Sequence, residues 1–197
     1  MHLVLDTPPG CRVRVTDGTL RASAASEGTA AHTLILGVGN EALCDEGLGV
    51  HVARALATQP LPPGVRVCDG GTPGYALLGE LEGVERLVIV DAMEMRLSPT
   101  TIVTVRPEEL RSLAPPDRAS LHGVGLLDAL DLARALGLLP GDVRIVGVQP
   151  ARVAWGLELS PALQRALPAV LDAVLAAALA PTDPEVPEKG EKWQWPR

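Results

Sequence analysis

Four runs of mainly apolar residues stand out along the central part of the chain, at residues 33–36, 65–69, 87–91 and 143–148. Such short runs, bounded by turn-forming residues, are typical of strands buried on both faces of a parallel sheet. A further run at residues 101–105 predicts an edge strand. The pattern of apolar runs therefore predicts the strands of one largely parallel sheet.

Helical spacing of apolar residues fills the stretches between these runs. The apolar positions of the first helix are Leu48, Val52 and Leu56. We expect Asp45 to cap this helix, and we predict further helices at residues 75–81 and 125–136. Ser160, followed by a proline, predicts the start of a last helix that is kinked or broken at Pro168.

The alternation of strands and helices predicts an α/β fold: a single domain with a mainly parallel, twisted sheet of about five strands and helices on both faces. We assign this domain to residues 32–180. Residues 1–31 are expected to be an N-terminal extension, as a short hairpin or disordered. Residues 181–197 are rich in Pro, Glu and Lys and are expected to be a disordered tail.

Composition narrows the range of partners. The formal net charge of −7 and the aromatic content of 2% disfavour nucleic acid, which needs a basic surface and aromatic platforms. The cysteines, Cys11, Cys44 and Cys68, form no CxxC pair, so we expect neither disulfides nor a zinc site and place the protein in the cytoplasm. No signal peptide is expected.

The most apolar stretch, residues 169–180, is interrupted by Asp172 and is expected to be too short to span a bilayer. We therefore expect a soluble monomer that binds no membrane.

The segment after the first strand, residues 37–47, allows two interpretations. Its glycines match a loose dinucleotide-binding fingerprint, with Asp69 as the ribose-binding acid. However, Glu41, Asp45 and Glu46 crowd the turn where a pyrophosphate would need positive potential. A nucleotide is disfavoured but stays an alternative.

Acidic residues also follow two other strands. Asp69 precedes the glycine turn Gly70-Gly71-Thr72, and we expect its carboxylate to cap backbone amides there. Asp91 ends an apolar run without such a turn, which favours a role in a site. Together with Glu46 and His122, from two other loops of the same sheet edge, it makes a set of two carboxylates and one imidazole that suits a divalent first-row metal.

Nucleophilic catalysis has little support in the sequence. The chain contains no G-x-S-x-G motif, which a hydrolase of the α/β class would use. Cys44 is flanked by acids, which disfavour a thiolate. His51 is expected to be a partly exposed helical residue.

Five ordered blocks resemble those of the hydrogenase maturation endopeptidase family, in particular its branch serving uptake hydrogenases. In sequence order they are Gly37-Val38-Gly39-Asn40 with Asp45-Glu46-Gly47, Asp69-Gly70-Gly71-Thr72-Pro73-Gly74, Val90-Asp91-Ala92, Ser120-Leu121-His122, and Gly147-Val148-Gln149-Pro150 with Trp155-Gly156-Leu157-Glu158-Leu159-Ser160-Pro161. The resemblance covers residues 33–180. Ala42 departs from the larger aliphatic residue that is frequent in the family, and the flanks lie outside the pattern.

The resemblance implies an endopeptidase that removes the C-terminal extension from the nickel-loaded large-subunit precursor of a [NiFe]-hydrogenase. It implies that Glu46, Asp91 and His122 are the catalytic and metal-binding residues, and that the nickel arrives with the precursor. The segment from Asp69 to Thr72 would shape the substrate cleft, and no residue is assigned to another cofactor. The alternatives are a nucleotide-binding oxidoreductase and a non-catalytic nickel chaperone.

Overall fold

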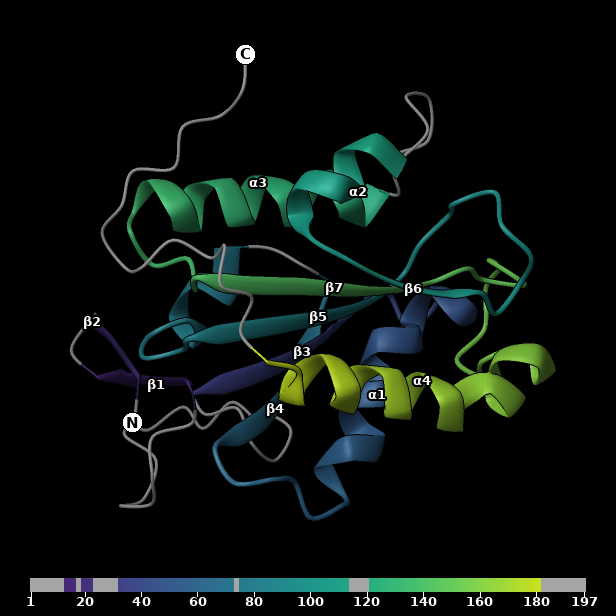
Figure 1. Cartoon of the computed structure of the whole chain (residues 1–197), viewed down its shortest axis with the longest axis horizontal. Coiled ribbons are helices and arrows are strands. Elements are labelled where there is room, and N and C mark those ends of the chain that lie inside the picture. Colours follow the sequence, from purple (N-terminus) through teal and green to yellow (C-terminus); the bar gives the residue numbers. More distant parts are fainter. Residues whose placement is uncertain (1–12, 17–18, 23–31, 73–74, 114–120, 182–197) are drawn as a thin grey trace.

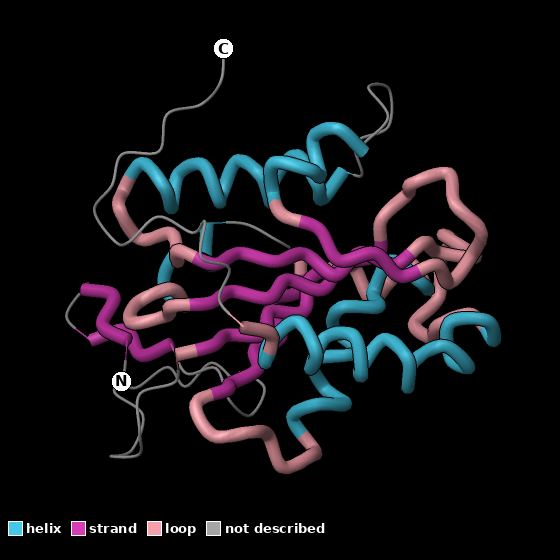
Figure 2. Tube along the Cα trace, viewed as in Figure 1, coloured by secondary structure: helices cyan, strands magenta, loops and turns pink. Residues whose placement is uncertain are grey.

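Five strands form one sheet in the computed structural model, which describes residues 13–16, 19–22, 32–72, 75–113 and 121–181. They are β3 (Thr33–Val38), β4 (Val65–Gly71), β5 (Arg86–Ala92), β6 (Ile102–Val105) and β7 (Asp142–Val148). Their order in space is β4-β3-β5-β7-β6, and every neighbouring pair is parallel except β6 and β7. The predicted parallel sheet with an edge strand is confirmed (Figures 1 and 2).

The helical segments lie on both faces of the sheet. They are the 3₁₀ turns η1 (Asp45–Gly47) and η2 (Tyr75–Glu80) and the helices α1 (Leu48–Ala57), α2 (Pro107–Leu113), α3 (Leu121–Ala135) and α4 (Pro161–Leu179). Figure 1 shows α2 and α3 over one face and α1 and α4 over the other. The chain moves outward from β3 in one direction to β4 and in the other to β5 and β7. Right-handed crossovers in opposite directions place their helices on opposite faces.

Side-chain alternation along the strands divides the core into two layers. In β5, Leu87 and Ile89 pack with residues of α3, whereas Val88 and Val90 pack with α1 and α4. Successive side chains of a strand point to opposite faces. By this alternation Asp91, the next residue after Val90, lies on the α3 side of the sheet.

A separate antiparallel pair lies in the N-terminal extension, formed by β1 (Val13–Thr16) and β2 (Thr19–Ala22). A short hairpin was one of the two expectations for this part of the chain. Residues 1–12 and 23–31, and the expected tail beyond Pro181, lie outside the described residues.

Two predicted helix starts were wrong. Helix α1 begins at Leu48 with Gly47 as its N-cap residue, and Asp45 instead points into the protein interior. Helix α3 begins at Leu121, earlier than the predicted residue 125. The glycines at positions 123 and 125 lower helix propensity and concealed its first turn. His122 therefore lies inside the first turn of α3 rather than before it.

Helix α4 also differs from expectation because it continues through Pro168. Pro168 is exposed, and so is Gln164, whose carbonyl loses its helical partner, so water is available to replace that hydrogen bond. The helix has 19 residues, so its apolar segment begins well before residue 169, where the predicted stretch began. By length and composition α4 is the one described helix that could cross a membrane, which the shorter stretch of residues 169–180 did not indicate. Here its buried residues, among them Leu163, Val170 and Val174, pack in the core layer beside α1.

Candidate active site

The candidate site lies where the strand order reverses. Glu46 is in η1, which follows β3, and Asp91 is at the end of the neighbouring strand β5. From this pair of strands the chain builds the sheet outward in both directions. The carboxyl ends of strands at such a reversal leave a crevice in which α/β proteins bind ligands. The topology therefore brings two acids, far apart in sequence, to a binding position.

Two glycines allow the close packing that brings η1 against β5. At Gly39, which has a φ of 145°, an added Cβ would lie 2.0 Å from the carbonyl oxygen of Glu46. At Gly49, an added Cβ would lie 2.2 Å from the carbonyl oxygen of Val38 and 2.3 Å from that of Val90. A side chain at either position would push the turn away from the strand ends. The carbonyl of Glu46 also occupies the space beside Gly39, which disfavours a pyrophosphate there.

Asp91 is the most perturbed acid of this site. Its side chain is buried, and its Oδ1 atom accepts no hydrogen bond from the described residues. Burial raises the pKa of Asp91 to about 8, a hydrogen bond from the backbone of Ala92 lowers it in part, and the nearby charge of Glu46 raises it. The carboxyl group thus holds a proton at neutral pH unless a cation takes the place of that proton.

These features fit a site for a divalent cation. Two neighbouring carboxylates repel when both are ionised, and a cation bound by both relieves the repulsion. A third ligand could come from His122, because α3 covers the face on which Asp91 lies. The side chain of His122 is outside the described residues, and the described side chains contain no cluster of three or more His, Cys, Asp or Glu residues suited to a metal.

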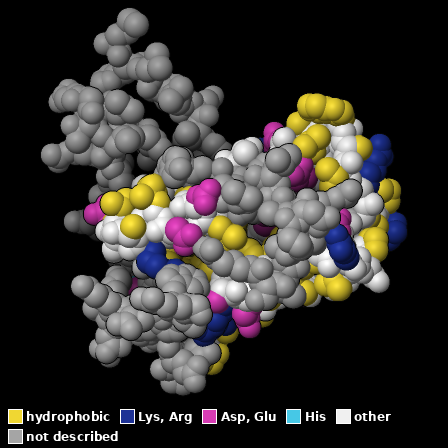
Figure 3. Space-filling view, turned by 90° about the horizontal axis from the view of Figure 1, so that it is seen from above, with side chains coloured by type: hydrophobic (Ala, Val, Ile, Leu, Met, Phe, Trp, Pro, Cys, Tyr) yellow, Lys and Arg dark blue, Asp and Glu magenta, His cyan; other side chains and the backbone are white. Residues whose placement is uncertain are grey.

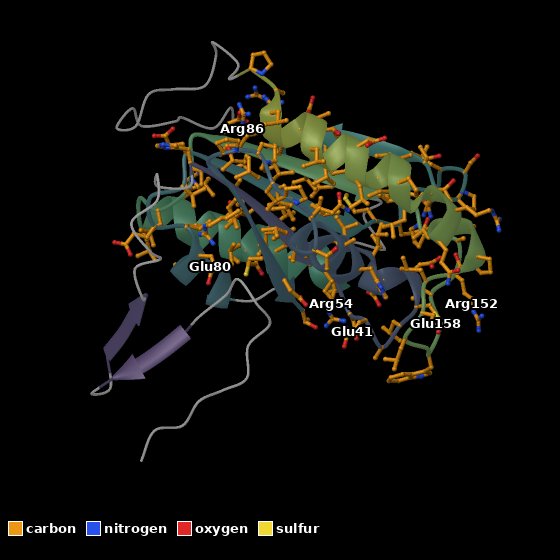
Figure 4. The ribbon with its side chains drawn as sticks, turned by 90° about the horizontal axis from the view of Figure 1, so that it is seen from below. Glu41, Arg54, Glu80, Arg86, Arg152 and Glu158 are labelled. Atoms are coloured by element: carbon orange, nitrogen blue, oxygen red, sulfur yellow. The ribbon has the colours of Figure 1, made fainter. Side chains whose placement is uncertain are left out.

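Asp69 has the structural role that we expected. Its Oδ1 atom accepts a hydrogen bond of 3.0 Å from the backbone amide of Gly71, and its Oδ2 atom lies 3.3 Å from Nε of Arg54. Arg54 also pairs with Glu41 at 2.6 Å, and Figure 4 shows these two side chains pointing toward each other. The amide of Gly39 donates to the carbonyl of Gly71, so the end of β4 lies directly beside the end of β3.

Asp45 is a residue whose role the sequence did not predict. It is fully buried, and its carboxylate accepts hydrogen bonds from the backbone amides of Ala151, Arg152 and Ser160, at 2.9, 2.8 and 2.6 Å. Three amide donors compensate a buried carboxylate without a cation. Asp45 therefore fixes the loop between β7 and α4 against the segment that carries Glu46.

Gln149 has a comparable role for the loop that follows β5. Its Oε1 atom accepts hydrogen bonds from the amides of Met95 and Leu97, at 2.8 and 3.2 Å. These amides belong to the loop that follows Asp91. The only sequence signal for Gln149 was its position at the end of a buried strand, in the fifth block.

Cys44 and His51 do not supply a nucleophile and base. Cys44 is a buried free thiol in a left-handed backbone conformation, with a φ of 54°. Its amide donates to the carbonyl of Gly156, so it serves the packing of two loops. His51 is partly exposed on α1, as expected, and its Nε2 atom lies 3.2 Å from the carbonyl oxygen of Leu157.

Comparison with known proteins shows the family to which the chain belongs. Residues 50–177, which include Asp91 and His122, match the family model described as hydrogenase maturation protease. The chain is 37% identical over 146 residues to the hydrogenase 2 maturation protease of Escherichia coli K12, covering 73% of this chain and 88% of that one. It is 38% identical over 132 residues to the hydrogenase expression/formation protein HupD of Rhodobacter capsulatus, covering 66% of this chain and 63% of that one.

Solved structures give the same result. The hydrogenase maturating endopeptidase HybD from E. coli has a TM-score of 0.67 and 36% identity, with 74% of this chain and 91% of that chain covered. The [NiFe] hydrogenase maturation protease HybD from Thermococcus kodakarensis has a TM-score of 0.65 and 29% identity, with 75% and 99% covered. The chain therefore belongs to the hydrogenase maturation protease family, a family of endopeptidases.

Proposed function

We propose that this protein cleaves the C-terminal extension from the large-subunit precursor of a [NiFe]-hydrogenase once nickel has been inserted. The observation that carries the proposal is the buried carboxyl group of Asp91, beside Glu46, at the strand reversal where ligands of such folds bind. Membership of the hydrogenase maturation protease family supports peptide cleavage as the reaction and a hydrogenase as the substrate.

In this proposal Glu46, Asp91 and His122 bind the nickel ion that the precursor presents. A bound divalent ion there supplies a Lewis acid beside the scissile peptide. Asp91 releases its proton when it binds a cation, because the pKa of about 8 keeps it protonated otherwise. Three ligands leave positions open for groups of the substrate, so nickel stays mainly with the precursor and reports that the metal centre is loaded.

We propose that the end of β4, with the residue that follows it, borders the same crevice and shapes the cleft for the peptide. The residues concerned are Asp69, Gly70, Gly71 and Thr72. The hydrogen bond and the ion pair of Asp69 give this strand end a fixed form, which suits a surface against which an extended peptide lies. We further propose a cytoplasmic, monomeric enzyme, and the free thiols of Cys44 and Cys68 agree with a reducing compartment.

The test is the mass of the precursor after incubation with the protein. Precursor purified with nickel should lose its C-terminal peptide, whereas precursor made without nickel should keep it. Asp91→Ala and His122→Ala should abolish the mass change. Asp172→Ala, which removes an exposed acid on α4, is the matched control and should process normally.

Each arm can contradict a specific part of the proposal. Equal cleavage of both precursors would remove nickel as a recognition element. Normal processing by both Asp91→Ala and His122→Ala would remove these residues from the site. No mass change with the unaltered protein, despite binding of the nickel-loaded precursor, would favour the non-catalytic chaperone.

A further inference from the structure

The loop between β7 and α4 exposes three large apolar side chains next to the candidate site. We call residues 151–159 the rim loop. The exposed fractions are 56% for Val153, 83% for Trp155 and 68% for Leu157. Elsewhere among the described residues the exposed large apolar side chains are leucines, and no more than two of them, Leu136 and Leu138, lie within five residues of each other. Three such side chains within five residues are an unusual concentration for a surface that faces only water.

Figure 3 agrees with this distribution. It shows hydrophobic side chains beside Lys and Arg side chains at the end of the molecule where the parallel strands finish. Figure 4 places Arg152 and Glu158 at that same end. The rim loop thus combines an apolar centre with charged groups at its border, which is the usual composition of a protein-binding surface.

The rim loop is held rigidly despite its exposure. Asp45 accepts hydrogen bonds from the amides at both ends of the loop, and the amide of Gly156 donates to the carbonyl of Ala42. The amide of Cys44 in turn donates to the carbonyl of Gly156. A loop fixed in this way presents its side chains without an ordering cost when a partner binds.

The position of the loop identifies the partner. The segment to which it is hydrogen bonded, residues 42–45, leads directly into Glu46. A protein that offers a peptide to Glu46 and Asp91 must therefore lie against the rim loop. We propose that the rim loop is the docking surface for the folded body of the hydrogenase large-subunit precursor, an inference that rests on the proposed function.

Trp155 is the main anchor of this contact. Aromatic side chains at the centre of an interface contribute most of its binding energy, and the indole ring loses little conformational entropy on burial. The precursor surface that fits is apolar at its centre and offers polar partners to Arg152 and Glu158. The charged acids of the crevice bind the metal-bearing segment, and the rim loop holds the body from which that segment extends.

The experiment compares processing kinetics of full-length variants with nickel-loaded precursor. Trp155→Ser combined with Leu157→Ser should raise KM about tenfold or more and leave kcat at saturating precursor unchanged. Trp155→Ser alone should give part of this effect. Leu136→Ser combined with Leu138→Ser is the matched control, since it removes two exposed leucines from the turn after α3, and should leave KM unchanged.

The outcomes separate the two proposals. Cleavage by the unaltered protein together with an unchanged KM in the double rim-loop variant would overturn the docking surface but leave the proposed function standing. Absence of cleavage by the unaltered protein would overturn the function itself. A dimer of the unaltered protein in sedimentation, dissolved by Trp155→Ser while KM stays the same, would assign the loop to self-association and also overturn the proposal.

Discussion

Replacing Asp91 by asparagine should stabilise the metal-free protein, by an amount that grows with pH. The side chain is buried, so its ionised form is a carboxylate without hydration and without a cation to compensate its charge. Asparagine has nearly the same shape and cannot ionise. It also keeps an oxygen that can accept the hydrogen bond from the backbone of Ala92.

The magnitude follows from the pKa in the two states. In the unfolded chain Asp91 ionises with its ordinary pKa of 3.8, whereas in the folded protein the value is about 8. Between these values the folded state binds more protons than the unfolded state, so the free energy of unfolding falls as pH rises, by about 1.4 kcal/mol per pH unit. Above pH 8 the penalty is complete and on the order of 5 kcal/mol.

Urea unfolding of the metal-free proteins at pH 5 and pH 8 tests this reasoning. The free energy of unfolding of Asp91→Asn, relative to the unaltered protein, should increase by about 3 kcal/mol between the two pH values. Asp142→Asn is a control for which the opposite sign is expected. Burial acts to raise the pKa of Asp142, but hydrogen bonds from Arg144 and Arg86 lower it. Loss of this carboxylate should therefore destabilise the protein at both pH values. A constant difference for Asp91→Asn across this range would refute the buried, proton-binding carboxyl group.

Two further predictions concern the scaffold. Arg86→Met should lower the free energy of unfolding by about 3 kcal/mol in urea denaturation, because it breaks the buried ion pair with Asp142 at 2.8 Å, whereas Glu85→Gln, which breaks an exposed pair, should cost less than about 1 kcal/mol. Gly49→Ala should cost at least about 3 kcal/mol, because the methyl group would collide with two strand carbonyls, whereas Gly79→Ala meets no atom within 4 Å and should be nearly neutral in the same assay.

The strands were predictable because each of them consists of consecutive, mainly apolar residues. Leu87, Val88, Ile89 and Val90 are all fully buried, two on each face, so no alternation was needed to identify a central strand. Helix α2 was missed, although a signal existed: Pro107 occupies the first helical position, and Glu109 accepts a hydrogen bond of 2.7 Å from the amide of Arg106. Its short length hid this signal.

Only those residues of the candidate site that lie at or just after the end of a strand could be predicted. Glu46 follows β3 and Asp91 lies at the end of β5, and these strands are neighbours, so position along the chain was enough to predict that the two acids lie at the same sheet edge. The role of Asp45 could not be predicted, because its partners, from Ala151 to Ser160, are more than one hundred residues away. From the sequence alone, an acid before a helix is equally compatible with a helix cap, because the residues that it contacts in the fold are not known.

The 3₁₀ turn explains how adjacent acids acquire opposite roles. In such a turn successive side chains are about 120° apart, so neighbours cannot face the same surroundings. Asp45 points inward and holds the rim loop through three amides, whereas the charge of Glu46 raises the pKa of Asp91. Gly47 completes the turn, since a Cβ there would lie 2.6 Å from Cα of Glu41. The turn thus couples the proposed metal site to the proposed docking surface through consecutive residues, so that a precursor seated on the rim loop has its metal-bearing segment aligned with Glu46.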